Sequence, residues 1–164
     1  MEIQDPAMQD PSATVVTIGD ELRTIEDQLI RLTREGSGGE RSLDEVIAEL
    51  AVFAERIRPH FFLVQEALER RDLAYEVVAR LEEMRKRVLW LYRRSRLEQV
   101  FYSKLRLERL LRDTLYRQVL ETYDEFSAME ALEARLRGLS EDLLAVELLH
   151  QEGKSVSGEA EVAR

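Results

Sequence analysis

Glu147 and His150 are the two residues whose types and spacing are most typical of a metal-binding motif. In di-iron carboxylate bundles, a Glu and a His three positions apart lie on one face of a helix. Such a site needs a second motif of this kind, but Ile57 stands three positions before His60, the only other histidine. A symmetric dimer could supply the second motif. A surface Glu beside a half-exposed His near a helix end is the simpler interpretation, and we expect no metal or other cofactor.

The chain offers few other residues for catalysis. It has no cysteine, which excludes thiolate nucleophiles, disulfides and cysteine-based zinc sites. Its 33 acidic residues would form many accidental pairs on helices. The glycine-rich segment 36–39 lacks the lysine, the spacing and the preceding strand of a phosphate-binding loop. We therefore predict that the protein is not an enzyme, and a carboxylate-bundle metal protein is kept only as a third alternative.

Charge is distributed unevenly along the chain. Residues 80–117 contain twelve Lys or Arg and five Asp or Glu, so this segment carries +7. Because the whole chain carries −9, the remaining residues together carry −16. A basic segment inside an acidic protein indicates an electrostatic contact, either with another molecule or with acidic helices of the same chain.

The centre of this basic segment is an apolar run, residues 88–92, with a cluster of Arg and Lys on each side. Successive helical residues turn by about 100°, so five apolar residues in a row point in every direction. Such a run is either the middle of a bundle or a face that meets another molecule. The candidate partner-binding residues are the large and cationic side chains of this region: Arg85, Arg87, Leu89, Trp90, Tyr92, Arg93, Arg94 and Arg96.

Two kinds of partner fit these residues. Guanidinium groups can bind phosphates, while Trp90 and Tyr92 can stack on bases, as in nucleic-acid-binding proteins. The net negative charge of the chain opposes such binding at long range. We therefore predict a non-enzymatic interaction protein that binds a protein partner, such as an adaptor, a chaperone-like protein or an assembly subunit. Nucleic-acid binding through residues 80–117 is the alternative, and neutralisation by other helices of the chain also stays open.

Helices must position these residues, because composition and periodicity both favour an all-α fold. The chain has 35% charged residues with only seven Gly and three Pro, which is typical of long helices. The first helix is predicted over residues 17–34, where apolar residues recur in steps of four and three: Ile18, Leu22, Ile25, Leu29 and Leu32. This seam is too short for an independent coiled coil, so it needs a partner helix.

Further signals predict where the later helices begin and end. Residues 35–41 contain three glycines and form the predicted flexible linker, after which Ser42 begins a capping box for the second helix. At Pro59 we favour a break over a kinked continuation, because proline removes a helical hydrogen bond. Near residue 71, where the apolar register shifts, a break or a stutter is a candidate. Residues 95 and 126 are further candidates for a break, because capping-box patterns recur there, although such patterns also occur by chance inside helices.

The predicted fold is an all-α bundle of about five or six helices, with long central helices packed as in a coiled coil, over residues 15–152. Residues 1–14 are predicted to be a disordered acidic tail and 153–164 a flexible polar tail, with Ser140 capping a last helix that ends at Gly153. A homodimer is predicted, because several seams are wider than one short helix would cover. No secretory signal and no apolar run of roughly 18–20 residues, the length of a membrane span, are visible, so a cytoplasmic location is predicted.

Overall fold

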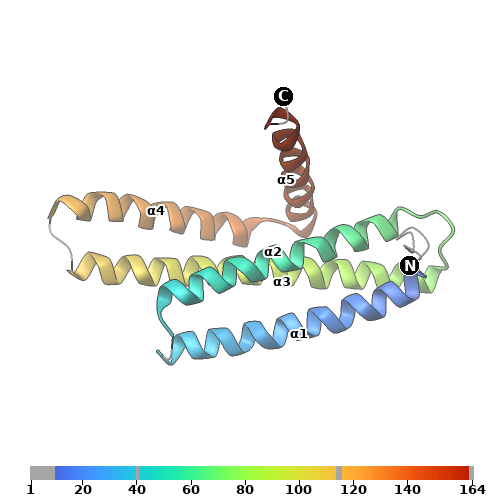
Figure 1. The fold of residues 1–164 in the computed structure, drawn as a ribbon, viewed down its shortest axis with the longest axis horizontal. Coiled ribbons are helices and arrows are strands. Elements are labelled where there is room, and N and C mark those ends of the chain that lie inside the picture. Colours follow the sequence, from blue (N-terminus) through green and yellow to red (C-terminus); the bar gives the residue numbers. More distant parts are fainter. Residues whose placement is uncertain (1–9, 40, 114–115, 163–164) are drawn as a thin grey trace.

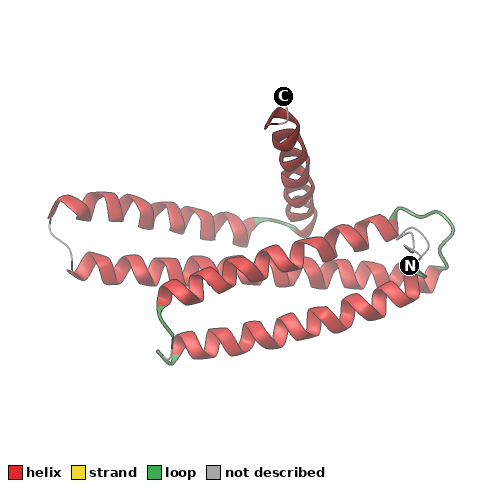
Figure 2. Cartoon of the chain, in the orientation of Figure 1, coloured by secondary structure: helices red, strands yellow, loops and turns green. Residues whose placement is uncertain are grey.

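The computed structural model describes residues 10–39, 41–113 and 116–162, and in these ranges the chain is all-α, with five helices and no strand (Figures 1 and 2). The helices are α1 (Pro11–Ser37), α2 (Leu43–Leu68), α3 (Tyr75–Asp113), α4 (Tyr116–Gly138) and α5 (Glu141–Val162). The predicted all-α bundle is therefore confirmed.

The first two helices and the first part of α3 form a three-helix bundle, in which α2 runs opposite to both α1 and α3 (Figure 1). The predicted seam of α1 is confirmed, because its five residues from Ile18 to Leu32 are each at most 3% exposed. α2 covers this seam with a buried row that includes Leu50, Ile57 and Phe61. Burial of these apolar side chains is the main source of the bundle's stability.

The long helix α3 continues beyond this bundle and packs against α4 (Figure 1). Leu81, Val88 and Leu91 lie on its buried face and are fully buried. Near the end of α1, Tyr102 of α3 donates a hydrogen bond from its hydroxyl to the Thr33 carbonyl at 2.9 Å. α3 thus contacts each of the other four helices.

The last helix, α5, projects away from the long axis of the bundle (Figure 1). Its first turn is capped as predicted, because the Leu143 amide donates a hydrogen bond to Ser140 Oγ at 3.3 Å. Leu144 and Leu148 are buried in the core cluster, where α5 packs on α3. The orientation of α5 leaves its opposite face towards solvent.

Two predicted helix ends are wrong. α1 begins at Pro11, where a proline at the first position is tolerated, and Asp10 caps it by accepting a hydrogen bond from the Ser12 amide at 3.1 Å. Residues 11–14 are therefore helical, while residues 1–9 of the predicted tail lie outside the described ranges. At the other end, α5 does not stop at Gly153 and runs to Val162. The predicted linker is shorter than expected, because α1 includes Ser37.

The favoured break at Pro59 is also wrong and the candidate breaks near residues 95 and 126 do not occur, whereas the candidate near residue 71 is confirmed by the loop between α2 and α3. α2 passes through Pro59 without ending, because Phe61 and Val64 continue its buried row. Ser95 caps no helix and lies within α3, fully buried, with no hydrogen-bond partner for its hydroxyl among the described residues. α4 already begins at Tyr116, so no helix starts near residue 126.

Candidate interaction surfaces

The apolar run Val88–Tyr92 is divided between the core and the surface. Leu89 and Tyr92 are only 1% and 7% exposed, so they stabilise the bundle and are not accessible to a partner. Trp90 is 50% exposed. Of the three large apolar residues predicted to meet a partner, the structure therefore leaves Trp90 at the surface and places the other two in the core.

Several predicted cations contact other helices of the same chain. Arg87 forms an ion pair with Glu26 of α1, with 3.0 Å between nitrogen and oxygen. Arg85 donates a hydrogen bond from Nε to the side-chain oxygen of Gln65 in α2 at 3.3 Å. These two arginines therefore connect α3 to its neighbours, which supports neutralisation within the chain for part of the basic segment.

Two other predicted arginines have contacts near the end of α4 or on α3 itself. Arg93 donates a hydrogen bond to the backbone carbonyl of Leu139, just before α5 begins. Arg96 donates to the side-chain oxygen of Gln99, one turn further along α3, at 3.3 Å. Arg93 thereby positions the connection between α4 and α5 beside the middle of α3.

A shallow hollow of about 400 Å³ surrounds Trp90 and forms the first candidate surface. We name it the Trp90 surface, and its residues are Trp90, Arg93, Arg94, Leu97, Glu98, Phe101 and Arg137. Its centre is apolar, because Trp90, Leu97 and Phe101 follow one face of α3 at spacings of seven and four, and Phe101 is 56% exposed. The Arg94 guanidinium lies 5.2 Å from the centre of the Trp90 ring, in cation–π contact.

Four members of this surface are not among the predicted residues: Leu97, Glu98, Phe101 and Arg137. Phe101 lies eleven positions after Trp90, close to three helical turns, and this spacing could have identified it. Arg137 comes from the end of α4, and its place depends on how α4 packs against α3. No local sequence pattern indicates that contact.

The exposed face of α5 forms the second candidate surface, which we name the α5 stripe: Leu143, Val146 and Leu149. These side chains are 55%, 58% and 41% exposed, on the side of α5 opposite to its buried residues. Residues 141–151 contain three acidic residues and no Lys or Arg. One of the acids, Glu147, forms an ion pair with Arg135 of α4.

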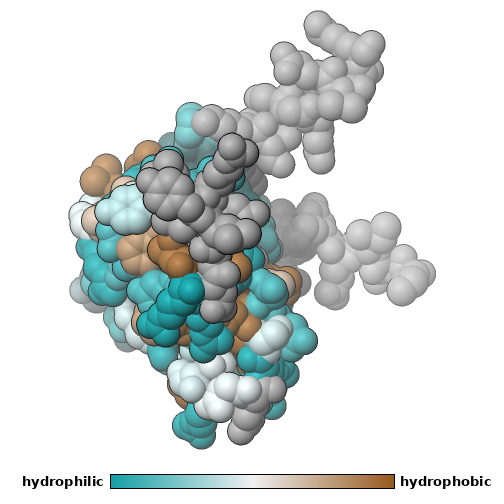
Figure 3. All heavy atoms as spheres, turned by 90° about the vertical axis from the view of Figure 1, so that its left-hand side faces the viewer, coloured by the Kyte–Doolittle hydropathy of each residue, from teal (hydrophilic) through white to brown (hydrophobic). Residues whose placement is uncertain are grey.

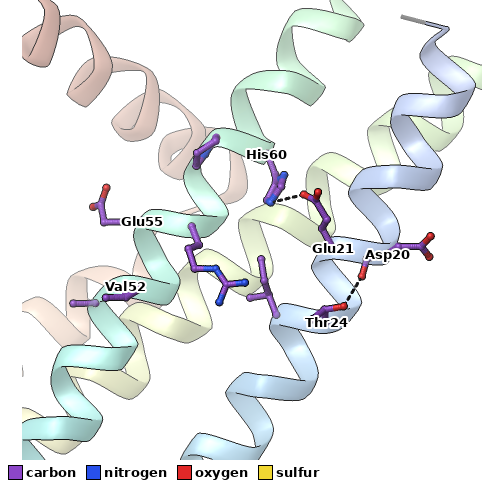
Figure 4. Close-up of a pocket in the computed structure, with 10 residues that line it drawn as sticks. Asp20, Glu21, Thr24, Val52, Glu55 and His60 are labelled. Carbon is purple, nitrogen blue, oxygen red and sulfur yellow. Dashed lines mark hydrogen bonds and ion pairs between the residues drawn. The ribbon is translucent and has the colours of Figure 1, made fainter.

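A third candidate surface is the groove between α1 and α2, with a volume of about 920 Å³ (Figure 4). Ile25, Ala51, Val52 and Pro59 supply apolar lining. Polar groups of both helices complete it: Asp20, Glu21, Thr24, Glu55, Arg56 and His60. The lining can accept an apolar group.

His60 is the titratable residue of this groove that burial affects. Its Nε2 atom lies 3.2 Å from a carboxylate oxygen of Glu21 (Figure 4). Burial lowers the pKa of His60 below its ordinary value of 6.5; the Glu21 carboxylate raises it by a smaller amount, and Arg56 lowers it further. The imidazole is therefore mostly neutral at neutral pH and serves as a polar edge of the groove.

Glu147 and His150 do not form a metal centre with other described residues. Both residues line a hollow of about 260 Å³ beside Tyr92 and Arg96, but Glu147 is paired with Arg135. Within the described ranges, no three His, Asp or Glu side chains gather closely enough to hold a metal ion.

The remaining cations of α3 divide into paired and solvent-exposed groups. Lys104 pairs with Glu133 of α4 at 2.9 Å, and its hydrogen bond is the main cause of the lowered pKa of Glu133. Arg106 pairs with Asp44 of α2 at 2.9 Å. Four others are exposed and have no ion pair with any residue that the structure describes: Arg80, Lys86, Arg109 and Arg112.

Where described residues are visible, the face shown in Figure 3 is mainly hydrophilic, with smaller hydrophobic areas. In the described part of the chain, no helix has both the length and the apolar character needed to cross a membrane.

Comparison of the chain with protein-family models, curated proteins and solved structures found no match. The function must therefore be inferred from the chain's own residues.

Proposed function

We propose that this chain is a non-enzymatic helical interaction protein that binds a protein partner through the Trp90 surface. The observation that carries this proposal is that Trp90 and Phe101 are each at least half exposed on one face of α3. Large aromatic and arginine side chains at the centre of an interface contribute much of its binding energy. The Trp90 surface combines both types of side chain in one hollow.

The charges of this surface favour a protein partner over nucleic acid. The hollow contains Glu98 as well as its arginines, and the whole chain carries −9. Part of the basic segment is already neutralised by Glu26, Asp44 and Glu133. A mixed surface with an apolar centre is typical of protein–protein interfaces, which have a polar rim.

Nucleic-acid binding is the second candidate function, because four exposed cations follow α3 on both sides of Trp90: Arg80, Lys86, Arg109 and Arg112. Cations that contact phosphates make binding weaken steeply as salt concentration rises. In that case Arg109→Glu and Arg112→Glu would reduce binding as much as Arg94→Glu does. A protein interface centred on Trp90 would depend mainly on Arg94.

The test is affinity capture of the tagged full chain from its native cells, with and without nuclease, followed by mass spectrometry. We expect defined protein partners that survive nuclease and are lost from Trp90→Ala and Phe101→Ala. Tyr123→Ala is the matched control, since Tyr123 is a 59% exposed aromatic residue on α4 outside the Trp90 surface. Circular dichroism must show that all three variants keep the wild-type helix content.

Two results would contradict the proposal. Partners that disappear after nuclease treatment would support the second candidate function. Partners that bind Trp90→Ala as well as the wild type would exclude the Trp90 surface as their binding site. The choice among adaptor, chaperone-like protein and assembly subunit, and the cytoplasmic location, stay predictions.

A further inference from the structure

α5 is apolar on two opposite faces. Leu144, Ala145 and Leu148 are at most 2% exposed where α5 packs against the bundle. Leu143, Val146 and Leu149, the α5 stripe, are 41% to 58% exposed on the other side. A helix that is apolar all round is normally covered on all sides. The structure of one chain therefore leaves the α5 stripe uncovered.

The α5 stripe cannot reach the Trp90 surface of its own chain. α5 contacts α3 through its buried face, so the stripe points away from the helix that carries Trp90. Both surfaces nevertheless flank the same connection between α4 and α5, because Arg137 belongs to the Trp90 surface and Arg93 binds the Leu139 carbonyl. Each chain thus presents two uncovered apolar areas close to one another.

The two areas are complementary in charge. The Trp90 surface contains three arginines and one glutamate. Residues 141–151 of α5 contain three acids and no Lys or Arg, and Asp142 lies about 40° from Val146, the middle of the stripe, by the 100° turn of each helical residue. Complementary potentials guide two surfaces into contact and fix their register. The two stripes repel each other by the same logic, because both lie on acidic segments.

We infer that the partner at the Trp90 surface is a second copy of this chain, which places its α5 stripe over Trp90 and Phe101. This inference rests on the proposed function of the Trp90 surface. In a two-fold dimer the contact is reciprocal, so each α5 covers the Trp90 surface of the other copy. One symmetric arrangement then buries both uncovered areas of both chains and leaves neither available for further growth.

The test uses two full-length variants with complementary defects. Val146→Asp/Leu149→Asp disrupts the α5 stripe and keeps the Trp90 surface, whereas Trp90→Glu does the reverse. We expect the wild type to be a dimer in analytical ultracentrifugation, and each variant alone to dimerise at least roughly 30-fold more weakly, the effect of losing one interface hot spot. Leu63→Asp on α2, where Leu63 is 45% exposed, is the matched control and should dimerise as the wild type does.

Mixing the two variants identifies the reciprocal contact. In a mixed dimer, the intact α5 stripe of the Trp90→Glu variant meets the intact Trp90 surface of the Val146→Asp/Leu149→Asp variant. We therefore expect a mixed dimer in native mass spectrometry. If stripe met stripe, or Trp90 met Trp90, a mixed dimer would contain no intact contact, and the variant that keeps the self-contacting surface would dimerise by itself as the wild type does. Any of three results would overturn the inference: the absence of a mixed dimer, a dimer that neither variant weakens, or a monomeric wild type.

The same variants separate this inference from the proposed function. A monomeric wild type that captures other proteins only when Trp90 is present would overturn the second-copy inference and leave the proposed function supported. A wild type that dimerises while Trp90→Glu dimerises equally well and keeps every captured partner would overturn both.

Discussion

His60 combines a half-buried position with a carboxylate neighbour, and the two act on its pKa in opposite directions. Burial dominates, so the pKa of His60 lies below its ordinary value of 6.5 despite the Glu21 contact. Between the folded pKa and 6.5 the unfolded chain binds more protons than the folded chain. We therefore predict that the stability contributed by neutral His60 is complete above pH 6.5 and is lost as the pH falls below that value.

This prediction can be checked by thermal unfolding between pH 7.5 and pH 5, above the range in which most carboxylates titrate. His60→Gln should reduce the fall in melting temperature, because a neutral amide does not gain a proton. His150→Gln replaces an exposed histidine on α5 and serves as the matched control. An equal fall in the wild type and in His60→Gln would show that Glu21 balances burial, and a smaller fall in the wild type would show that Glu21 outweighs it. The other charged groups around the groove are Asp20, Glu55 and Arg56.

The residues of the Trp90 surface show how far a sequence alone can identify a site. The register of Val88 and Leu91 fixes the buried face of α3, and Trp90 lies about 200° from Val88, so its exposure follows from helical spacing. Helical spacing places Leu89 off the main seam as well. Its burial could therefore be predicted only from the positions of the neighbouring helices. Arg137 lies 47 positions after Trp90 in the chain and joins the surface because α4 packs against α3.

At the scale of the elements, apolar seams and the capped helix starts at Ser42 and Ser140 were predictable, whereas several other helix boundaries were not. The seam of α1 and the cap at Ser42, whose hydroxyl accepts a hydrogen bond from the Glu45 amide at 3.3 Å, depend on nearby residues only. Pro59 and Ser95 carry local signals for a break, but each lies in a helix that buries apolar residues on both sides of it. Tertiary burial outweighs these local preferences.

Pro59 allows this balance to be measured. Proline inside a helix costs about 3 kcal/mol through the lost hydrogen bond and the clash with the preceding turn, whereas its stiffness returns up to about 1 kcal/mol by restricting the unfolded chain. Because Pro59 is exposed at the groove, Pro59→Ala removes little packing. We predict that this variant is more stable than the wild type by about 1 kcal/mol or more in urea unfolding.

Ala51→Pro provides the contrast on the same helix, because it adds a second interruption to α2 and should destabilise the chain. If Pro59→Ala proved less stable than the wild type, α2 would require the geometry that proline imposes at this position. The shape of the groove that Pro59 lines would then be a feature that the proline maintains.

At the scale of the whole molecule, the unequal charge distribution has a structural explanation. Ion pairs connect α3 to α1 through Glu26, to α2 through Asp44 and to α4 through Glu133. The acidic helices thus surround part of a basic central helix. Since each exposed pair contributes at most about 1 kcal/mol, the pairs select the arrangement of helices more than they stabilise it.

The buried side chains divide the molecule into a thick part, which contains the core cluster, and a thin part, which contains few buried side chains. The core cluster lies in α1, α2, the first part of α3 and the start of α5, whereas Leu136 is the one described residue of α4 that is buried. Segments with few buried apolar contacts open at lower free energy than the core does. We therefore predict that amides in residues 121–138 exchange with deuterium at least about ten times faster than those in residues 43–68, a difference of about 1.4 kcal/mol in opening.

Hydrogen-exchange mass spectrometry of the intact chain measures both segments in one experiment, and α3 supplies an internal control. Residues 81–95 pack in the three-helix bundle and should be protected like α2, while residues 108–112 contribute no side chain to the core cluster and should exchange like α4. A uniform rate along α3 would contradict the division, because it would mean that the whole molecule opens as one cooperative unit. Protection of α4 that rises with protein concentration would instead indicate that dimerisation covers the thin part, as expected if α5 of a second copy binds at the Trp90 surface beside Arg137.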